Sequence, residues 1–138
     1  MEFGESTRSA KDAAAAIGCE LGQIVKSLVF KTGKTERPVL ILASGVNRVS
    51  EALIRDALGE KLGKADAEFV RQSTGFAIGG VPPFGLANKL PIFIDEDLLK
   101  YSTLWAAAGT PNAVFELTPH ELLEASEGIV RKVSEGDA

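Results

Sequence analysis

The run Pro-Val-Leu-Ile-Leu-Ala at positions 38–43 constrains the fold more than any other part of this sequence. It is apolar at almost every position and has the length of a strand. A strand that does not alternate between polar and apolar residues is typical of burial on both faces of a sheet. The run therefore predicts a strand whose two faces are both covered.

Helix and strand signals fill most of the remaining chain. Helices are expected at 10–17, 48–58, 66–72 and 119–126. Ser9 would cap the first, Asn47 would cap the second, and Thr118 opens a capping box before the last. Further strands are expected at 24–32, 91–94, 104–108, 113–117 and 128–133. Strands outnumber helices and cluster after residue 75, so the predicted class is α+β with a mixed, strongly curved sheet.

The composition fits a single domain over residues 1–138. The chain is 45% hydrophobic and 25% charged, near the average for a soluble globular protein. Its formal net charge of −4 argues against long DNA duplexes, whose binding needs many phosphate contacts. One cysteine and one histidine argue against zinc sites and Cys/His catalysis, so no metal or other cofactor is expected. With no apolar run of ~20 residues and no leader pattern, the sequence predicts a soluble cytoplasmic protein without a membrane partner.

Lys26 interrupts the apolar strand at 24–32. On strict alternation it shares a face with Ile24, Leu28 and Phe30. If that face is the core, a buried ammonium is costly unless it is paired or faces a ligand-filled cleft. If the face is solvated, the lysine extends its amine into water along the sheet surface. Strand physics alone leaves both interpretations open.

The segment at 75–85 reads Gly-Phe-Ala-Ile-Gly-Gly-Val-Pro-Pro-Phe-Gly and is the most unusual of the chain. Pro82-Pro83 excludes a central strand, and Gly79-Gly80 allows positive φ and close approach of a ligand. Backbone N–H groups in such a loop can bind a phosphate, a carboxylate or an oxyanion. A tight connection that needs these residues for its shape alone is equally consistent with the pattern. Neither dinucleotide nor Walker motifs are present.

Other candidate residues favour structural interpretations. The turn at 109–112 matters only if the fold brings it beside Gly79-Gly80. The run Asp95-Glu96-Asp97 is typical of a helix start, and it has no matching ligand cluster for a metal. Cys19 and Trp105 are expected to be structural.

Together these residues carry a family resemblance. The sequence resembles the YbaK-type aminoacyl-tRNA deacylases, which also occur as the editing domain of bacterial prolyl-tRNA synthetases. The matching pieces cover nearly the whole chain from Ser6 onward and occur in family order: SAKDAAAAIGC, IVKSLVF, GFAIGGVPPFG, PIFIDEDLL and AAGTPNAVFELTPHELL.

The resemblance implies a mixed, barrel-like sheet flanked by helices, and hydrolysis in trans of the ester between a wrong amino acid and the tRNA 3′-terminal adenosine. It implies that Lys26 contacts the substrate end and that main-chain groups of Gly79, Gly80 and Gly109 surround the ester. It places further substrate contacts at Ser27, Val81, Pro83, Phe84, Gly85, Thr110 and Asn112. The implied partner is the acceptor 3′ end of a mischarged tRNA, and association with a synthetase stays open.

Two other functions remain open at this stage: a non-catalytic module that holds a tRNA end or nucleotide, and a small-molecule sensor. The absence of a Ser-His or Cys-His pair in the sequence favours hydrolysis without a covalent intermediate on the protein. Positive charge for RNA is expected around the first hairpin turn and after the second helix, at Lys31, Lys34, Arg37, Lys61 and Lys64.

Overall fold

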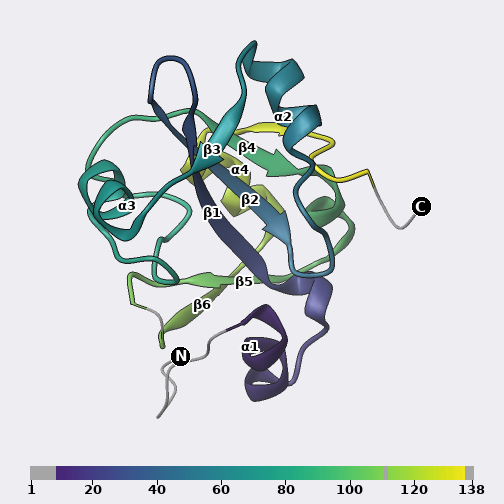
Figure 1. The fold of residues 1–138 in the computed structure, drawn as a ribbon. Coiled ribbons are helices and arrows are strands. Elements are labelled where there is room, and N and C mark those ends of the chain that lie inside the picture. The colour runs from purple at the N-terminus through teal and green to yellow at the C-terminus, as the bar shows by residue number, and fades with distance from the viewer. Residues whose placement is uncertain (1–8, 111, 136–138) are drawn as a thin grey trace.

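The computed structural model describes residues 9–110 and 112–135 (Figure 1). The helices are α1 (Ala10–Ile17), α2 (Glu51–Leu58), α3 (Ala67–Thr74) and α4 (Pro119–Ser126), with the 3-10 turns η1 (Leu21–Gln23) and η2 (Glu96–Lys100). The strands are β1 (Val25–Thr32), β2 (Pro38–Ser44), β3 (Leu62–Lys64), β4 (Ile92–Asp95), β5 (Leu104–Ala107), β6 (Val114–Leu117) and β7 (Ile129–Arg131). Within the described ranges no helix has the length and apolarity to cross a bilayer.

The strands form an open mixed sheet and a separate ribbon. The sheet has the order β3-β1-β2-β4-β7, in which β1 pairs antiparallel with both β2 and β3, whereas β2–β4 and β4–β7 are parallel. Strands β5 and β6 form a two-stranded ribbon, and a parallel bridge from Ile24 to Trp105 joins it to the start of β1. The α+β class and the mixed sheet are therefore confirmed. The barrel-like description is not, because β3 and β7 remain two separate edges.

Strand β2 carries the apolar run and divides the core. Leu40 and Leu42 lie in the cluster on one face of the sheet, with side chains from α3, the β5–β6 ribbon and α4. Val39, Ile41 and Ala43 lie in the cluster on the other face, with Ile54 of α2. All five β2 side chains are at most 1% exposed, so the prediction of burial on both faces is confirmed.

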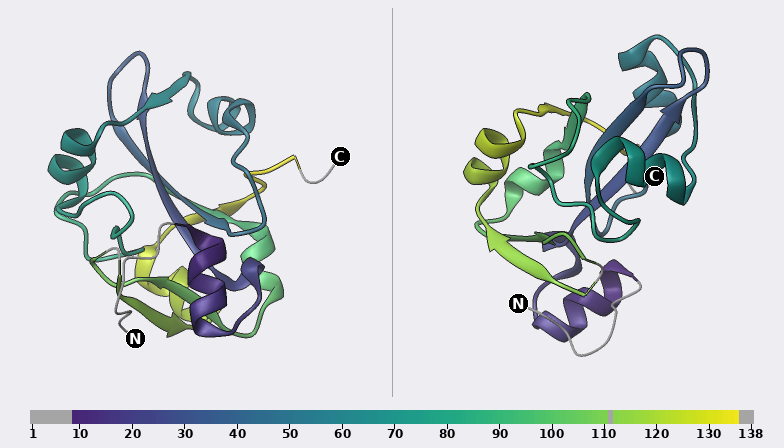
Figure 2. Two further views of the ribbon diagram at one scale, coloured as in Figure 1. Left: turned by 60° about the horizontal axis from the view of Figure 1, so that its bottom comes forward. Right: turned by 90° about the vertical axis from the view of Figure 1, so that its left-hand side faces the viewer.

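The remaining elements surround these two clusters. Figure 2 shows α1 next to the β5–β6 ribbon, at the end of the sheet away from α2. Ala13 and Ala14 of α1 form a third apolar cluster with Ile24 at the start of β1. This arrangement brings α1, β1 and the ribbon together at one end of the molecule.

Most predicted helix ends are confirmed, with one correction. Ser9 accepts a hydrogen bond from the Asp12 N–H at 3.1 Å, and Gly18 ends α1 at φ 84°. Helix α2, however, begins at Glu51 and is capped by Ser50, so Asn47 is not its cap. Asn47 was a sound cap by residue type, but its carboxamide is bound by carboxylates far along the chain.

The sequence analysis missed β3 and η1, and it predicted η2 only as a helix start. Strand β3 has only three residues, with a glycine in the middle, which gives no recognisable alternation. The turn η2 begins at the acidic run, where Asp95 accepts a hydrogen bond from the Asp97 N–H at 3.0 Å. The prediction that this run marks a helix start is therefore confirmed.

The α4 capping box gives a stability prediction. The Thr118 hydroxyl accepts from the Glu121 N–H at 3.1 Å, and the Glu121 carboxylate accepts from the Thr118 N–H at 2.8 Å. We expect Thr118→Ala to lower the free energy of unfolding in urea by about 0.5–2 kcal/mol, because a main-chain donor loses its acceptor. The exposed Ser102→Ala is the control and should change it by less than about 0.5 kcal/mol. Equal effects of both variants would contradict the prediction.

Candidate functional site

Lys26 lies on β1 opposite Ala43 of β2 and is half-buried. Its side chain lies on the α2 face of the sheet, as the alternation predicts. The Lys26 Nζ donates a hydrogen bond to the main-chain carbonyl of Asn47. The lysine is therefore neither fully buried nor extended into water, but held against the loop that follows β2.

Burial lowers the pKa of Lys26 below the usual lysine range. The negative charge of Asp95 opposes this shift, and the positive charge of Arg48 adds to it. Arg48 is exposed and follows Asn47 directly in the chain. Lys26 therefore has a carboxylate and a second cation in its surroundings.

The loop that holds Lys26 is fixed by a network around Asp95. The Asn47 Nδ2 donates to Asp95 Oδ2 at 2.8 Å and to Asp97 Oδ2 at 2.7 Å. Asp95 is 1% exposed, and its Oδ2 also accepts from the Ser44 N–H at 2.9 Å. Asp97 pairs with Lys100 at 2.8 Å. These contacts fix the Asn47 main chain and hence the acceptor of the Lys26 ammonium.

A pocket of about 220 Å³ opens along the free part of β1. β2 occupies one edge of β1, whereas β3 pairs only with Phe30–Thr32 on the other, so the first half of that edge faces β5. Residues of α1, β1, β5 and β6 and the turn at 78–79 line the pocket. Lys26, Ser27 and Gly79, which the sequence analysis singled out, all line it.

Ser27 faces the opposite side of the sheet from Lys26. It pairs with Leu42 of β2, so its side chain lies on the face of the larger apolar cluster. Its hydroxyl oxygen is buried and has no hydrogen-bond partner within the described ranges. A buried hydroxyl without a partner is unfavourable, and this one lies on the core side of β1 and not on the side of Lys26.

The two glycine turns are in direct contact. Gly79 is exposed at φ 88°, and Gly80 behind it is buried. A Cβ on Gly80 would lie 2.9 Å from main-chain atoms of Thr110 and 3.1 Å from the Gly109 carbonyl oxygen, so only glycine fits there. The Gly80 N–H donates to the Ala77 carbonyl at 2.9 Å and is used within its own turn. Gly109 lies at φ 103° against the Phe76 ring.

Other residues with predicted contacts lie elsewhere. Val81 and Pro83 are buried in the core. The Thr110 hydroxyl donates to Asn112 Oδ1 at 2.9 Å within the turn that joins β5 to β6. Phe84 and Gly85 line a different cavity of about 610 Å³, and the Phe84 ring meets Phe115 edge-on with centroids 5.7 Å apart.

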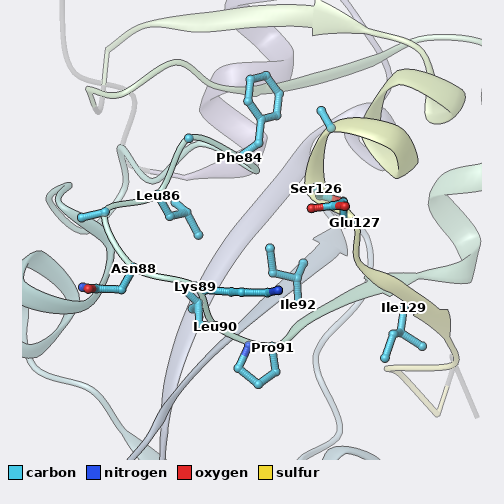
Figure 3. A pocket seen from close by; sticks show the side chains of 13 residues that line it. Phe84, Leu86, Asn88, Lys89, Leu90, Pro91, Ile92, Ser126, Glu127 and Ile129 are labelled. Carbon is cyan, nitrogen blue, oxygen red and sulfur yellow. The ribbon is translucent and has the colours of Figure 1, made fainter.

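That second cavity lies between the segment 84–92 and the end of α4 with β7, as Figure 3 shows. Phe84 and Gly85 therefore do not share the pocket of Lys26.

Of the basic residues that were expected to contact RNA, Lys31 already has partners within the protein. Lys31 pairs with Glu36 at 3.5 Å and lies 5.2 Å above the Phe69 ring. Arg48, which sequence analysis did not single out, is the cation beside Lys26. Across 9–110 and 112–135 no group of at least three His, Cys, Asp or Glu side chains could hold a metal ion.

Comparisons with known proteins identify the family. Residues 4–125 match the family model described as "Aminoacyl-tRNA editing domain", so the chain belongs to this family. It is 38% identical over 125 residues to the uncharacterized protein YwhH of Bacillus subtilis, covering 91% of this chain and 79% of that protein. A solved structure of "a putative trans-editing enzyme for prolyl tRNA synthetase" shares 50% identity and a TM-score of 0.91, over 99% of this chain and 85% of the other.

A more distant relative is the "Putative Cys-tRNA(Pro)/Cys-tRNA(Cys) deacylase EbsC" of Enterococcus faecalis, 26% identical over 91% of this chain and 77% of that protein. The proline–tRNA ligase of Limosilactobacillus fermentum is 33% identical over 63% of this chain but only 16% of the ligase. The predicted resemblance to editing domains is thus confirmed.

The environment of Lys26 gives a titration prediction. We expect the NMR titration midpoint of its ε-methylene to lie below the ordinary lysine value of about 10.4, because burial disfavours the ammonium. Arg48→Gln should raise the midpoint by removing a like charge, and Asp95→Asn should lower it by removing an opposite one. A midpoint at or above the ordinary value would contradict the burial of this amine.

The Asp95 network gives a second stability prediction. We expect Asp95→Ala to lower the free energy of unfolding by about 2–5 kcal/mol, because the Ser44, Asn47 and Asp97 donors lose their acceptor. The control is Asp56→Ala, whose carboxylate is 70% exposed beside Arg55. It should change the value by no more than about 0.5 kcal/mol, measured by urea unfolding. An Asp95→Ala loss as small as the control's would show that the network contributes little.

Proposed function

We propose that this protein acts in trans on mischarged tRNA and hydrolyses the ester that joins the wrong amino acid to the 3′-terminal adenosine. The observation that carries the proposal is the pocket shared by Lys26, Ser27 and Gly79 in a chain of the editing-domain family. Editing needs a second hydrolytic site because a synthetase pocket rejects a smaller amino acid by only ~10- to 200-fold. The relative EbsC, named as a deacylase, and the structure named for trans-editing are consistent with this role.

Lys26 binds the nucleotide end of the substrate in this proposal. One hydrogen bond of its ammonium goes to the Asn47 carbonyl, and the remaining N–H donors are available to a ribose hydroxyl or a phosphate. Arg48 adds positive charge on the same side. In this proposal the protein contacts only the acceptor end of the tRNA, because a protein of net charge −4 has few cations to neutralise phosphates along the rest of the molecule.

The Gly79 turn is the proposed oxyanion site. Gly79 lines the pocket at positive φ, and its main-chain N–H is the candidate donor to the developing negative charge on the ester oxygen. Gly80 and Gly109 support it from behind, since Gly80 packs against the turn at 109–110. Gly80 cannot itself supply a second donor in this conformation, because its N–H is bonded to Ala77.

The nucleophile in this proposal is water or a hydroxyl of the substrate. The side chains that line the described pocket include neither a histidine, a cysteine nor a carboxylate that could activate a protein nucleophile. The ester is already an activated bond, so orientation and charge stabilisation can supply the required rate. A synthetase that delivers the tRNA is a natural partner, because the relatives include prolyl-tRNA ligases.

The experiment is release of labelled amino acid from a panel of mischarged tRNAs. We expect the wild-type protein to release label from at least one member, and Lys26→Ala to lower kcat/KM by roughly 100-fold or more, because a charged group at the reacting end is lost. Lys89→Ala, which alters an exposed lysine at the other cavity, is the control and should keep wild-type activity.

Lys26→Ala with the wild-type rate would remove this lysine from the mechanism. Binding of the tRNAs without release of label would favour the alternative, a non-catalytic module that holds the tRNA end.

A further inference from the structure

The first half of β1 has one edge that lacks a neighbouring strand. On the opposite edge, β2 pairs with residues 25–31. On this edge, the described residues provide only an isolated bridge between Ile24 and Trp105 and the short pairing of β3 with Phe30–Thr32. The pocket described above is lined by residues 24–28 of this stretch, so it opens where the edge is left without a strand partner.

Hydrogen bonds at the two ends of β1 show which residues face this edge. The Gly45 N–H donates to the Ile24 carbonyl at 2.8 Å, on the β2 side. The Thr32 N–H donates to the Arg37 carbonyl at 2.9 Å, also on the β2 side. Successive residues of an antiparallel strand direct their main-chain groups to opposite edges, so the even-numbered residues of β1 face β2. The N–H and the carbonyl of Ser27 therefore point away from β2, toward the pocket.

Ser27 meets the pocket through its main chain. It lines the pocket, but its hydroxyl oxygen is buried on the face of the larger apolar cluster. A strand edge presents main-chain N–H and carbonyl groups side by side, and an edge without a partner can bind an extended ligand as an added strand. Ser27 thus offers one donor and one acceptor to a ligand in the pocket.

The opposite wall of the pocket comes from β5. The Ala108 N–H donates to the Ala113 carbonyl at 2.9 Å within the β5–β6 hairpin, so the main chain of Ala107 points away from β6 and toward β1. Ala107 lines the pocket as well. The volume of about 220 Å³ is below the roughly 300–1,000 Å³ of sites for drug-sized molecules. A short, extended group therefore fits between the two strand edges.

The aminoacyl group of the proposed substrate carries the groups that such an edge pairs with. An α-amino acid ester has N–H donors and a carbonyl oxygen on the two sides of one carbon atom, in the same order as a residue of a β-strand. The side chains that line the pocket within the described ranges include no carboxylate that could bind an ammonium. Main-chain carbonyls are therefore the main acceptors for the α-ammonium there.

We propose that the aminoacyl group binds to the main chain of Ser27 as one residue added to the edge of β1. Its α-ammonium donates to the Ser27 carbonyl, and its ester carbonyl accepts from the Ser27 N–H. This N–H also stabilises the negative charge that develops on the ester oxygen, and it is the second donor that Gly80 cannot supply. Recognition of this kind depends on the α-amino group of the substrate and not on its side chain. This inference rests on the proposed deacylase function.

The first test varies the α-substituent of the ester. One tRNA carries the amino acid that is released fastest from the panel, the α-hydroxy acid with the same side chain, or the acid without an α-substituent. Each rate is divided by the rate of the same ester without protein. We expect kcat/KM to fall in that order, by roughly 10- to 100-fold for the unsubstituted acid, because the Ser27 carbonyl loses a charged donor. Equal normalised values for the three esters overturn the inference.

The second test removes the Ser27 N–H itself. Residue 27 is replaced by the α-hydroxy acid analogue of serine, which keeps the side chain and changes the main-chain N–H to an ester oxygen. We expect kcat to fall roughly 100- to 1,000-fold, as for the loss of an oxyanion donor.

The matched control is the same replacement at Val29, whose N–H faces the same edge but which does not line the pocket. Both replacements also weaken one carbonyl that faces β2, so that effect is common to the two proteins. The protein altered at residue 29 should keep the wild-type rate, and equal losses at both positions overturn the inference. Thermal unfolding verifies that each protein is folded.

A binding measurement separates this inference from the proposed function. 3′-Alanylamino-adenosine and its propionyl counterpart, which lacks the α-amino group, carry an amide in place of the ester and are titrated calorimetrically. If no ester is hydrolysed but the alanyl amide binds more tightly and the replacement at residue 27 abolishes the difference, the hydrolase proposal fails and the contact with Ser27 stands. If esters are hydrolysed but neither rate nor binding depends on the α-amino group, the contact with Ser27 alone fails. Absence of both hydrolysis and binding overturns both proposals.

Discussion

The buried carboxylate of Asp95 is the interaction on which the site depends. It accepts hydrogen bonds from the main-chain N–H of Ser44 at the end of β2, from the Asn47 carboxamide and from the first turn of η2. A nearly unexposed carboxylate is tolerable only with such a set of donors. Because Asn47 in turn presents its carbonyl to Lys26, the position of the ammonium at the pocket is set by a group on the next parallel strand.

Local signals predicted most of the fold. The unbroken apolar run at 38–43, the Thr118 capping box and the Gly18 stop each act within a few residues, and each appears in the structure as expected. Asn47 was misassigned for a physical reason. A residue that can cap a helix can also bind a carboxylate, and the choice depends on β2 and β4 being parallel and ending at the same edge. The acidic run at 95–97 could have indicated a carboxylate partner for Asn47, but only if the parallel pairing of β2 with β4 had been known.

The structure places only some of the predicted site residues around one pocket, for similar reasons. Lys26 and Ser27 are neighbours on one strand, and Gly79 reaches them through a fold that the resemblance implied. Phe84 and Gly85 lie only a few residues further, yet the buried segment at 81–83 separates them, and they line another cavity. Closeness in sequence was a poor guide there, because a chain that passes through the core emerges on a different side.

The missing side chain at Gly80 has a mechanical consequence. Its main chain rests on that of Thr110 so closely that no Cβ fits between them, and the latter turn closes the β5–β6 hairpin. The Gly79-Gly80 turn, which lines the pocket through Gly79, is packed directly against the tip of the β5–β6 hairpin. The turn that lines the pocket therefore has no room to approach the hairpin tip, and the hairpin is itself joined to the start of β1 by the bridge between Ile24 and Trp105.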